Sequence, residues 1–246
     1  MEKNNLIITT EQLLKIRFHL GHKKNKLNTS MIPFIYGFRH NITIFHLEKI
    51  IFSLKIIYKA LIEIFAKRGT IFLASTQKDL PIYDYFKNFM NIKNNDDESN
   101  IYIHGYIAYK WINGIFTNYF FYRKLMDQIV SVEKELLNSR DKKYLKYLEG
   151  VQQRNYFPNP DLAVLFGYNV DACKEFNLLS VPVIGVLDSN ATKESYIYGI
   201  PGNDDSYEVL QFFFEFIKQT ERAGRLYEKN EFYMLCLAKA KSKVFE

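Results

Sequence analysis

Residues 70–75 read TIFLAS, and this short apolar run decides the fold class. Breaking signals flank it, with Arg68 and Gly69 on its amino-terminal side. A continuous apolar run of this length is typical of a strand covered on both faces, as in the centre of a parallel sheet. The run therefore predicts a central parallel strand.

The segments around this strand alternate between helical and extended patterns. Before it, apolar residues recur at helical spacing from Leu47 to Lys67. After it, the patterns predict strands at 101–106, 161–166, 181–187 and 195–200, and helices at 79–90, 116–139, 170–178 and 204–221. This alternation predicts an α/β fold with a doubly wound, mostly parallel sheet flanked by helices, of the flavodoxin-like kind.

Two further elements are predicted before the long helix. Thr9 or Thr10 can cap a first helix, which Gly21 is expected to end. Residues 34–45 read as a short β-hairpin around Arg39-His40-Asn41, because Asn tolerates the positive φ that a tight turn needs.

Composition limits the class of protein. The chain has 246 residues, of which 48% are hydrophobic, so it can bury the core of one large α/β domain with an insertion, or of two domains at most. Cys173 and Cys236 lie far apart and fit neither a metal nor a disulfide spacing, which agrees with a reducing compartment. No apolar run is long enough for a membrane span, and the amino terminus resembles neither a signal peptide nor a transit peptide.

Residues 17–49 form a basic segment, which is the strongest functional signal. The segment has one carboxylate, Glu48, near its end, and aromatic side chains at Phe34, Tyr36 and Phe38. Its fixed positive charges are Arg17, Lys23, Lys24, Lys26 and Arg39, with His22 and the amides of Asn25 and Asn28 among them. Cations interleaved with aromatics favour a surface for phosphate backbones, and a merely solvated basic loop is the alternative.

Evidence for catalysis is weak. The chain has no glycine-rich dinucleotide fingerprint and no Walker loop, and its His19-x-x-His22 spacing is not that of a zinc protease. Asp188, Asp204 and Asp205 fall where sites form on doubly wound sheets, so they could bind a metal with His19 or His22. The reading we favour is that Asp204 and Asp205 cap the last helix and Asp188 lies in a turn.

Four motifs, the last of which has two parts, together carry a family resemblance. They are residues 19–49 (HLGHKKNKLNTSMIPFIYGFRHNITIFHLEK), 111–118 (WINGIFTN), 160–162 (PDL), 181–190 (VPVIGVLDSN) and 200–205 (IPGNDD). Their order and spacing, across roughly residues 10 to 220, resemble the bacterial-type small-subunit ribosomal protein S2 family. Two positions depart from the pattern, because Asn113 replaces a second glycine and His46 an Asp-like residue.

The resemblance implies a structural constituent of the small ribosomal subunit, with no catalytic residue, no cofactor and no metal. The implied partners are small-subunit ribosomal RNA and neighbouring ribosomal proteins, with no membrane and no homo-oligomer. It also makes residues 111–118 an RNA-facing loop, although a lone Trp is as often a core residue. The RNA-binding residues added on this basis are Lys78, Lys110, Trp111, Asn113, Thr117, Asn118 and Arg123.

The resemblance suggests the inserted hairpin, and the local sequence patterns suggest the rest of the division of the chain. Residues 1–126 and 154–221 are expected to form one α/β domain, 127–153 an inserted helical hairpin that protrudes, and 222–246 a helical extension.

The many Phe, Tyr, Lys, Asn and Ile residues have A/T-rich codons, which favours an organelle gene and a mitochondrial ribosome. A chloroplast or a bacterial cytoplasm is the alternative location. The rival function is a nucleotide- or sugar-phosphate-binding enzyme on the same fold.

Overall fold

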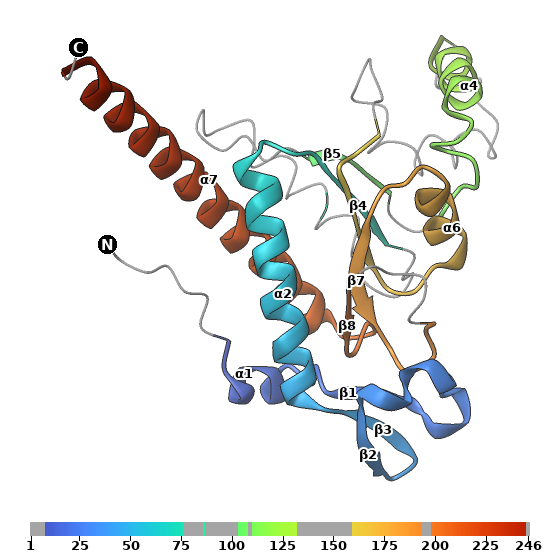
Figure 1. Cartoon of the computed structure of the whole chain (residues 1–246). Coiled ribbons are helices and arrows are strands. Elements are labelled where there is room, and N and C mark those ends of the chain that lie inside the picture. Colours follow the sequence, from blue (N-terminus) through green and yellow to red (C-terminus); the bar gives the residue numbers. More distant parts are fainter. Residues whose placement is uncertain are drawn as a thin grey trace.

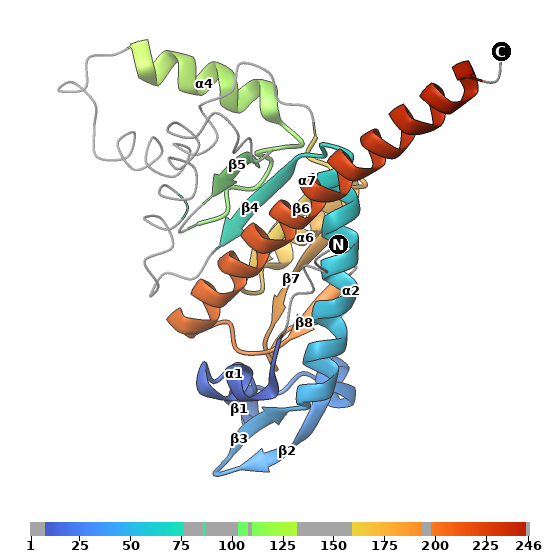
Figure 2. The ribbon, with the colours of Figure 1, turned by 90° about the vertical axis from the view of Figure 1, so that its left-hand side faces the viewer.

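The computed structural model describes residues 8–75, 86, 103–107, 110–131, 159–192 and 198–244, which form two sheets and their flanking helices (Figures 1 and 2). In chain order the elements are α1 (Thr10–Lys15), β1 (Leu20–Lys23), the 3₁₀ helices η1 (Lys24–Lys26) and η2 (Thr29–Phe34), β2 (Ile35–Arg39), β3 (Ile42–Phe45), α2 (Leu47–Ala66), β4 (Ile71–Ser75), β5 (Ile103–Ile107), α4 (Tyr119–Ser131), β6 (Leu162–Phe166), α6 (Val170–Leu178), β7 (Val183–Leu187), β8 (Tyr198–Pro201) and α7 (Tyr207–Val244).

The larger sheet has five described strands in the order β5-β4-β6-β7-β8, and all four neighbouring pairs are parallel. Counted along the chain from β4, this order is 2-1-3-4-5, which is that of flavodoxin-like sheets. The TIFLAS run forms β4, which lies between two neighbours and is buried at all five positions. The predicted doubly wound α/β fold is therefore confirmed.

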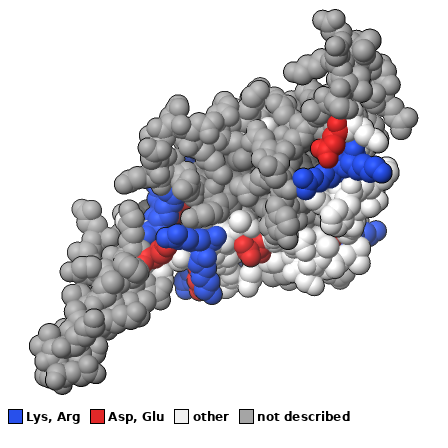
Figure 3. Space-filling view, turned by 90° about the horizontal axis from the view of Figure 1, so that it is seen from above, with Lys and Arg blue, Asp and Glu red and all other residues white. Residues whose placement is uncertain are grey.

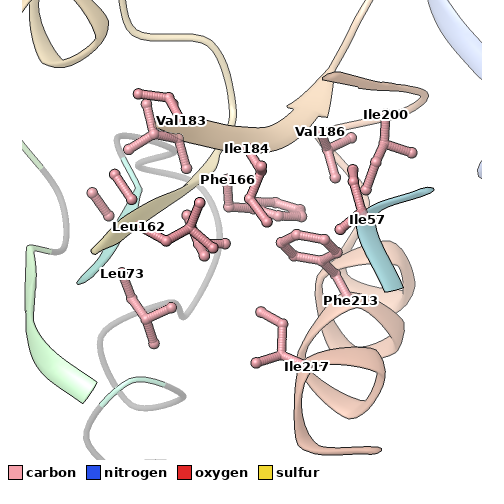
Figure 4. Close-up of a cluster of buried hydrophobic side chains, with 14 of the residues drawn as sticks. Ile57, Leu73, Leu162, Phe166, Val183, Ile184, Val186, Ile200, Phe213 and Ile217 are labelled. Atoms are coloured by element: carbon pink, nitrogen blue, oxygen red, sulfur yellow. The ribbon is translucent and has the colours of Figure 1, made fainter. Parts of the chain in front are cut away.

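Helices cover both faces of this sheet. In Figures 1 and 2, α2 and α7 lie on one face and α6 on the other. Figure 4 shows Phe213 and Ile217 of α7 and Ile57 of α2 pointing towards sheet residues that include Phe166 and Ile184. These side chains are at most 2% exposed, so burial of apolar surface holds the layers together.

The predicted elements match closely where the pattern is regular. The helix expected at 170–178 is α6 at the same bounds, and α2 ends one residue before the predicted Lys67. The hairpin is β2 and β3, with His40 and Asn41 both at positive φ in its turn. Each described strand of the larger sheet begins and ends within three residues of its prediction, whereas β1 was not predicted.

The first helix differs from its prediction. Thr9 caps it in a capping box with Gln12, as expected, but the helix ends at Lys15, because Arg17 takes a left-handed φ of 59°. Gly21 therefore does not end a helix and lies in β1. Leu13 and Phe18 reach the core, whereas Leu14 is 46% exposed.

The last helix also differs. It begins at Tyr207 rather than at position 204, and it continues without a break through the expected separate tail to Val244. Positions 79–90, apart from Phe86, and the hairpin residues 132–153 lie outside the described residues, while 127–131 belong to α4. Among the described helices, none combines the length and apolar character that crossing a membrane requires.

Candidate nucleic-acid interface

The basic segment folds into a small three-stranded sheet, β1-β3-β2, at one end of the molecule (Figures 1 and 2). Both strand pairs are antiparallel. Asn28 caps η2 by accepting a 3.0 Å hydrogen bond from the Ser30 amide, and Pro33 lies inside that helix. The segment is therefore ordered by short-range structure rather than being a loop.

The cations of this sheet point to solvent. Lys23 at the end of β1, Lys24 and Lys26 in η1, and Arg39 at the end of β2 are all exposed. None of them takes part in an ion pair within the described part of the chain. Since no Asp or Glu occurs from Gln12 to Leu47, the segment supplies no carboxylate of its own to neutralise them.

Other surfaces differ in this respect. In the described part of the face shown in Figure 3, Lys and Arg side chains lie beside Asp and Glu side chains. At the carboxyl end of α2, Arg68 Nε lies 2.6 Å from Glu228 Oε1. The exposed Lys and Arg side chains of the basic segment therefore stand out because none of them makes such an ion pair in the described part of the chain, a pattern suited to an anionic partner.

The segment is fixed against the carboxyl ends of β7 and β8. The Asn28 amide donates to the Ser189 carbonyl at 2.8 Å, and the Asn203 amide donates to the Phe18 carbonyl at 3.0 Å. A Cβ at Gly202 would lie 2.1 Å from the buried Phe18 ring, and one at Gly21 would lie 3.0 Å from Asp188 Oδ1. Both glycines are thus required by close approach, which holds the cations in a defined place.

A polar cluster lies at this junction. His22 Nδ1 is 2.8 Å from Asp188 Oδ2, and His22 Nε2 is 3.4 Å from Asp205 Oδ2. Asp188 and Asp204 are 1% and 3% exposed, and Asp204 Oδ1 is buried without a hydrogen-bond partner. One donor atom from each of the four residues falls within 4.8 Å of the others.

The cluster concentrates negative charge out of water. Burial, followed by repulsion from Asp188 and Asp205, raises the pKa of Asp204 to about 7. The hydrogen bond from His22 to Asp188 raises the pKa of His22 above its usual value. One imidazole nitrogen and three carboxylate oxygens form a donor set that suits a divalent cation such as Zn²⁺ or Mn²⁺.

This geometry corrects the expected capping role. Asp204 and Asp205 lie three and two positions before the first residue of α7, and Ser206 occupies the capping position. Asp188 precedes a turn as expected, but its carboxylate is buried against His22 and also accepts hydrogen bonds from the His22 and Ser189 amides. Of the two histidines considered as metal partners, the structure brings His22 into the cluster.

The second predicted region, residues 110–118, is built around a buried carboxylate. Glu175 of α6 is 5% exposed, and its oxygens accept hydrogen bonds from Trp111 Nε1 at 3.1 Å and from the Gly114 amide at 3.0 Å. They also accept from the amides of Phe116 and Thr117, at 2.7 and 3.0 Å, and from the Thr117 hydroxyl. One carboxylate therefore shapes the whole loop.

Around this anchor, the loop exposes several of the predicted contacts. Lys110, Asn113, Thr117 and Asn118 are exposed, as is Arg123 in α4. Trp111 corrects the sequence prediction, because its ring is 5% exposed and packs against Phe116 and Phe176. A buried ring is not placed to contact RNA.

The other predicted RNA-binding residues differ in whether their side chains are free to contact RNA. Arg17 and Asn25 are exposed, but both ring nitrogens of His22 face carboxylates, and the side-chain oxygen of Asn28 is used as a helix cap. Lys78 lies outside the described residues. In both views, the β2–β3 hairpin and α4 lie at opposite ends of the molecule (Figures 1 and 2). Helix α4 follows the loop 110–118 in the chain.

Sequence reasoning missed Glu175. The available signal was a lone carboxylate between Ala172 and Phe176, on the side that the predicted helix 170–178 turns to the core. A buried carboxylate needs several donors, so its position called for a partner elsewhere in the chain.

Comparison with known proteins agrees with this architecture. A family model described as Ribosomal protein S2 matches residues 13–224 of the 246. The matched range includes the basic segment, the cluster, the Glu175-bound loop and the parallel sheet. Members of this family are ribosomal proteins of the small subunit, with a structural rather than an enzymatic role. The chain therefore belongs to the ribosomal protein S2 family.

Proposed function

We propose that this protein binds small-subunit ribosomal RNA and neighbouring ribosomal proteins during assembly and translation, in the mitochondrial ribosome. The observation that carries the RNA part is the set of exposed cations Lys23, Lys24, Lys26 and Arg39 on a segment without carboxylates from Gln12 to Leu47. Phosphate contacts of this kind supply much of the affinity for RNA and fix the protein's orientation.

The Glu175-bound loop supports a second contact region. Its exposed Lys110, Asn113, Thr117 and Asn118 are presented on a loop that Glu175 holds by five hydrogen bonds, three of them from backbone amides. A preordered loop loses little conformational entropy on binding, which favours its use at an interface.

The mitochondrial location rests on composition. The chain has 21 Phe and 18 Tyr against 11 Gly, together with abundant Lys, Asn and Ile, which fits an A/T-rich genome such as that of an organelle. Plastid and bacterial ribosomes are the alternatives. Identifying the genome that carries the gene decides among the three.

The decisive experiment for the proposed role is sedimentation. Lysate from cells that express the tagged chain is fractionated on a sucrose gradient, and the protein is expected to travel with the small subunit. A variant with Lys23, Lys24, Lys26 and Arg39 all changed to Ala is expected to shift towards the top. A wild-type protein that remains at the top as a free monomer contradicts the proposal and favours the enzyme alternative.

We also propose that His22, Asp188, Asp204 and Asp205 bind one divalent cation, which would tie β1 to the ends of β7 and β8. The observation that favours this second role is the buried, unpartnered Asp204 Oδ1 within a group of four donors. A cation would offset the repulsion among three carboxylates and satisfy that oxygen.

Calorimetric titration of the metal-free full chain with ZnCl₂ and with MnCl₂ tests this site. We expect one bound ion per chain, lost in Asp204→Asn and kept in His40→Ala, which changes an exposed histidine outside the cluster. Equal binding by wild type and Asp204→Asn contradicts the assignment.

A further inference from the structure

The edge strand β2 exposes two aromatic rings. Tyr36 is 74% exposed and Phe38 is 47% exposed, whereas the neighbouring Phe18 and Phe45 rings are buried. The pairing of β2 with β3 shifts register between Ile35 and Gly37, so Tyr36 lies in a β-bulge. Bulges re-aim side chains and recur near functional sites, which gives the exposure of Tyr36 a structural cause.

The surroundings of these rings are ordered and cationic. Lys24 Nζ lies 5.1 Å from the centroid of the Phe38 ring, and the Tyr36 ring makes an edge-to-face contact with His46 at 5.4 Å. Arg39 follows Phe38 and is exposed. Each ring is therefore held from one side by a neighbour, which reduces the entropy that a bound ligand would have to overcome.

The strand position between the two aromatic residues is a glycine with open space beside it. A Cβ placed on Gly37 would meet no atom within 4 Å, and Gly37 is not among the residues with positive φ. Glycine in a strand often marks a place where another molecule approaches closely. Here the glycine separates the two exposed aromatics along β2.

From these contacts we propose that Tyr36 and Phe38 stack unpaired RNA bases, while Lys24 and Arg39 hold the adjoining phosphates. The inference rests on the RNA-binding role proposed above and names the part of the RNA that this face takes, which is single-stranded rather than duplex. Aromatic rings beside cations are the combination by which proteins bind single strands, since every base offers a flat face and every linkage a charge.

An edge strand can also receive a strand from another protein. The charge of this face favours RNA over that alternative. Lys23, Lys24, Lys26 and Arg39 would surround an added strand with like charges unless the partner were strongly acidic, whereas a phosphate backbone neutralises them.

The test compares two oligonucleotides with identical phosphates. Fluorescence anisotropy measures binding of the full chain to a labelled 12-nucleotide oligoadenylate and to the same backbone with abasic sites. Wild type is expected to prefer the oligoadenylate. Tyr36→Ala with Phe38→Ala is expected to weaken oligoadenylate binding about 5- to 100-fold per stacked base and to leave abasic binding unchanged.

Matched variants separate stacking from other effects. Tyr227→Ala is the control, because Tyr227 is 56% exposed on α7, away from the basic segment. Its neighbour Glu228 pairs with Arg68 at the far end of α2. This variant is expected to bind the oligoadenylate like wild type. Tyr36→Leu with Phe38→Leu keeps apolar bulk and is expected to bind as weakly as the Ala variant. Gly37→Leu fills the open space and is expected to weaken oligoadenylate binding as well. Circular dichroism confirms folding in each case.

Three outcomes overturn the inference. Equal affinity of wild type for both oligonucleotides shows that phosphates alone are bound, and the proposed RNA role then stands without stacking. Full rescue by the Leu pair shows an apolar contact. The Tyr36→Ala, Phe38→Ala variant could bind the oligonucleotides like wild type and yet no longer sediment with the small subunit. That result shows that a neighbouring protein covers this face. Failure of wild type to bind either oligonucleotide or ribosomal RNA at low salt instead contradicts the proposed function itself.

Discussion

The basic segment and the loop 110–118 both present polar side chains to solvent, yet they are held in opposite ways. The segment carries its cations on a small sheet, and that sheet is fixed by two glycines and a His-Asp cluster at the ends of β7 and β8. The loop is held from inside by one carboxylate, Glu175, that accepts five hydrogen bonds.

The two regions therefore differ in whether their charged side chains are exposed for binding or buried to support the backbone. In the segment, the functional charges are themselves exposed, and their supports lie at its base. In the loop, the dominant charge is buried and works only by shaping the backbone. Substitutions should therefore separate folding from binding in the segment and couple them in the loop.

The largest expected effect comes from Glu175→Ala. Four backbone or ring N–H groups would lose their acceptor in a buried site, so the free energy of unfolding should fall by about 3 kcal/mol or more. Urea denaturation followed by circular dichroism measures the change. Glu175→Gln should recover only part of it, because its amide nitrogen would face two of the same donors.

Glu215→Ala is the matched control for Glu175. Its carboxylate is 54% exposed on α7 and pairs with Lys218, so about 0.5 kcal/mol or less is expected. Similar losses in the two Ala variants would show that the Glu175 hydrogen bonds contribute nothing particular, and the contrast between segment and loop would fail.

Gly202→Ala should have the next largest effect, by disturbing the base of the segment. The added Cβ would lie 2.1 Å from a Phe18 ring atom, and Phe18 is fully buried, so about 1–3 kcal/mol of overpacking cost is expected. The melting temperature of the full chain measures it. Gly37→Ala, with no atom within 4 Å of its new Cβ, should melt close to wild type.

A third effect concerns pH in the metal-free protein. Asp204 and His22 both bind protons more tightly when folded, because burial raises the pKa of Asp204 to about 7 and the hydrogen bond to Asp188 raises the pKa of His22. The folded state therefore carries more protons than the unfolded state between their ordinary and raised pKa values. Stability from these groups is highest in acid and should fall by about 3 kcal/mol from pH 5 to pH 8, at roughly 1.4 kcal/mol for each pH unit below the raised pKa.

Urea midpoints measured with a chelator at pH 5, 6, 7 and 8 test this sign. Asp204→Asn should show a shallower fall, because the variant side chain does not titrate. Saturating ZnCl₂ should reverse the trend in wild type, since metal binding requires deprotonated ligands. Parallel curves for wild type and Asp204→Asn would contradict the account of the cluster.

Sequence reasoning succeeded where a residue's own chemistry determines its place. A run such as TIFLAS has to be buried, and Lys23, Lys24 and Lys26 have to stay in water, so the central strand and the exposed cations both followed from residue type. Asn41 in the hairpin turn followed from its tolerance of positive φ.

It failed where a residue's place depends on a distant partner. The sequence separation is 166 between His22 and Asp188, and 64 between Trp111 and Glu175. Nothing local marks Asp204 as buried rather than as a helix cap, because an acidic residue before a helix is usual in either case. Trp111 likewise has flanking polar residues whether its ring faces solvent or the core.

The smallest effect on folding, and the sharpest on binding, is expected for Lys23, Lys24 and Lys26 changed together to Ala. All three are exposed and outside the described ion pairs, so the unfolding free energy should change by about 0.5 kcal/mol or less. Binding to small-subunit ribosomal RNA should weaken, and its log–log salt slope should flatten by about two to three units, at roughly 0.7 to 0.9 for each phosphate that the variant no longer neutralises. Affinity measured across a salt series, with circular dichroism as the folding control, separates these two quantities.

Changing Lys55, Lys59 and Lys67 of the α2 region to Ala removes the same charge elsewhere and should leave the slope close to that of wild type. If both triple variants flatten the slope equally, net charge rather than the ordered segment determines binding, and the segment has no more than the role of a solvated basic surface.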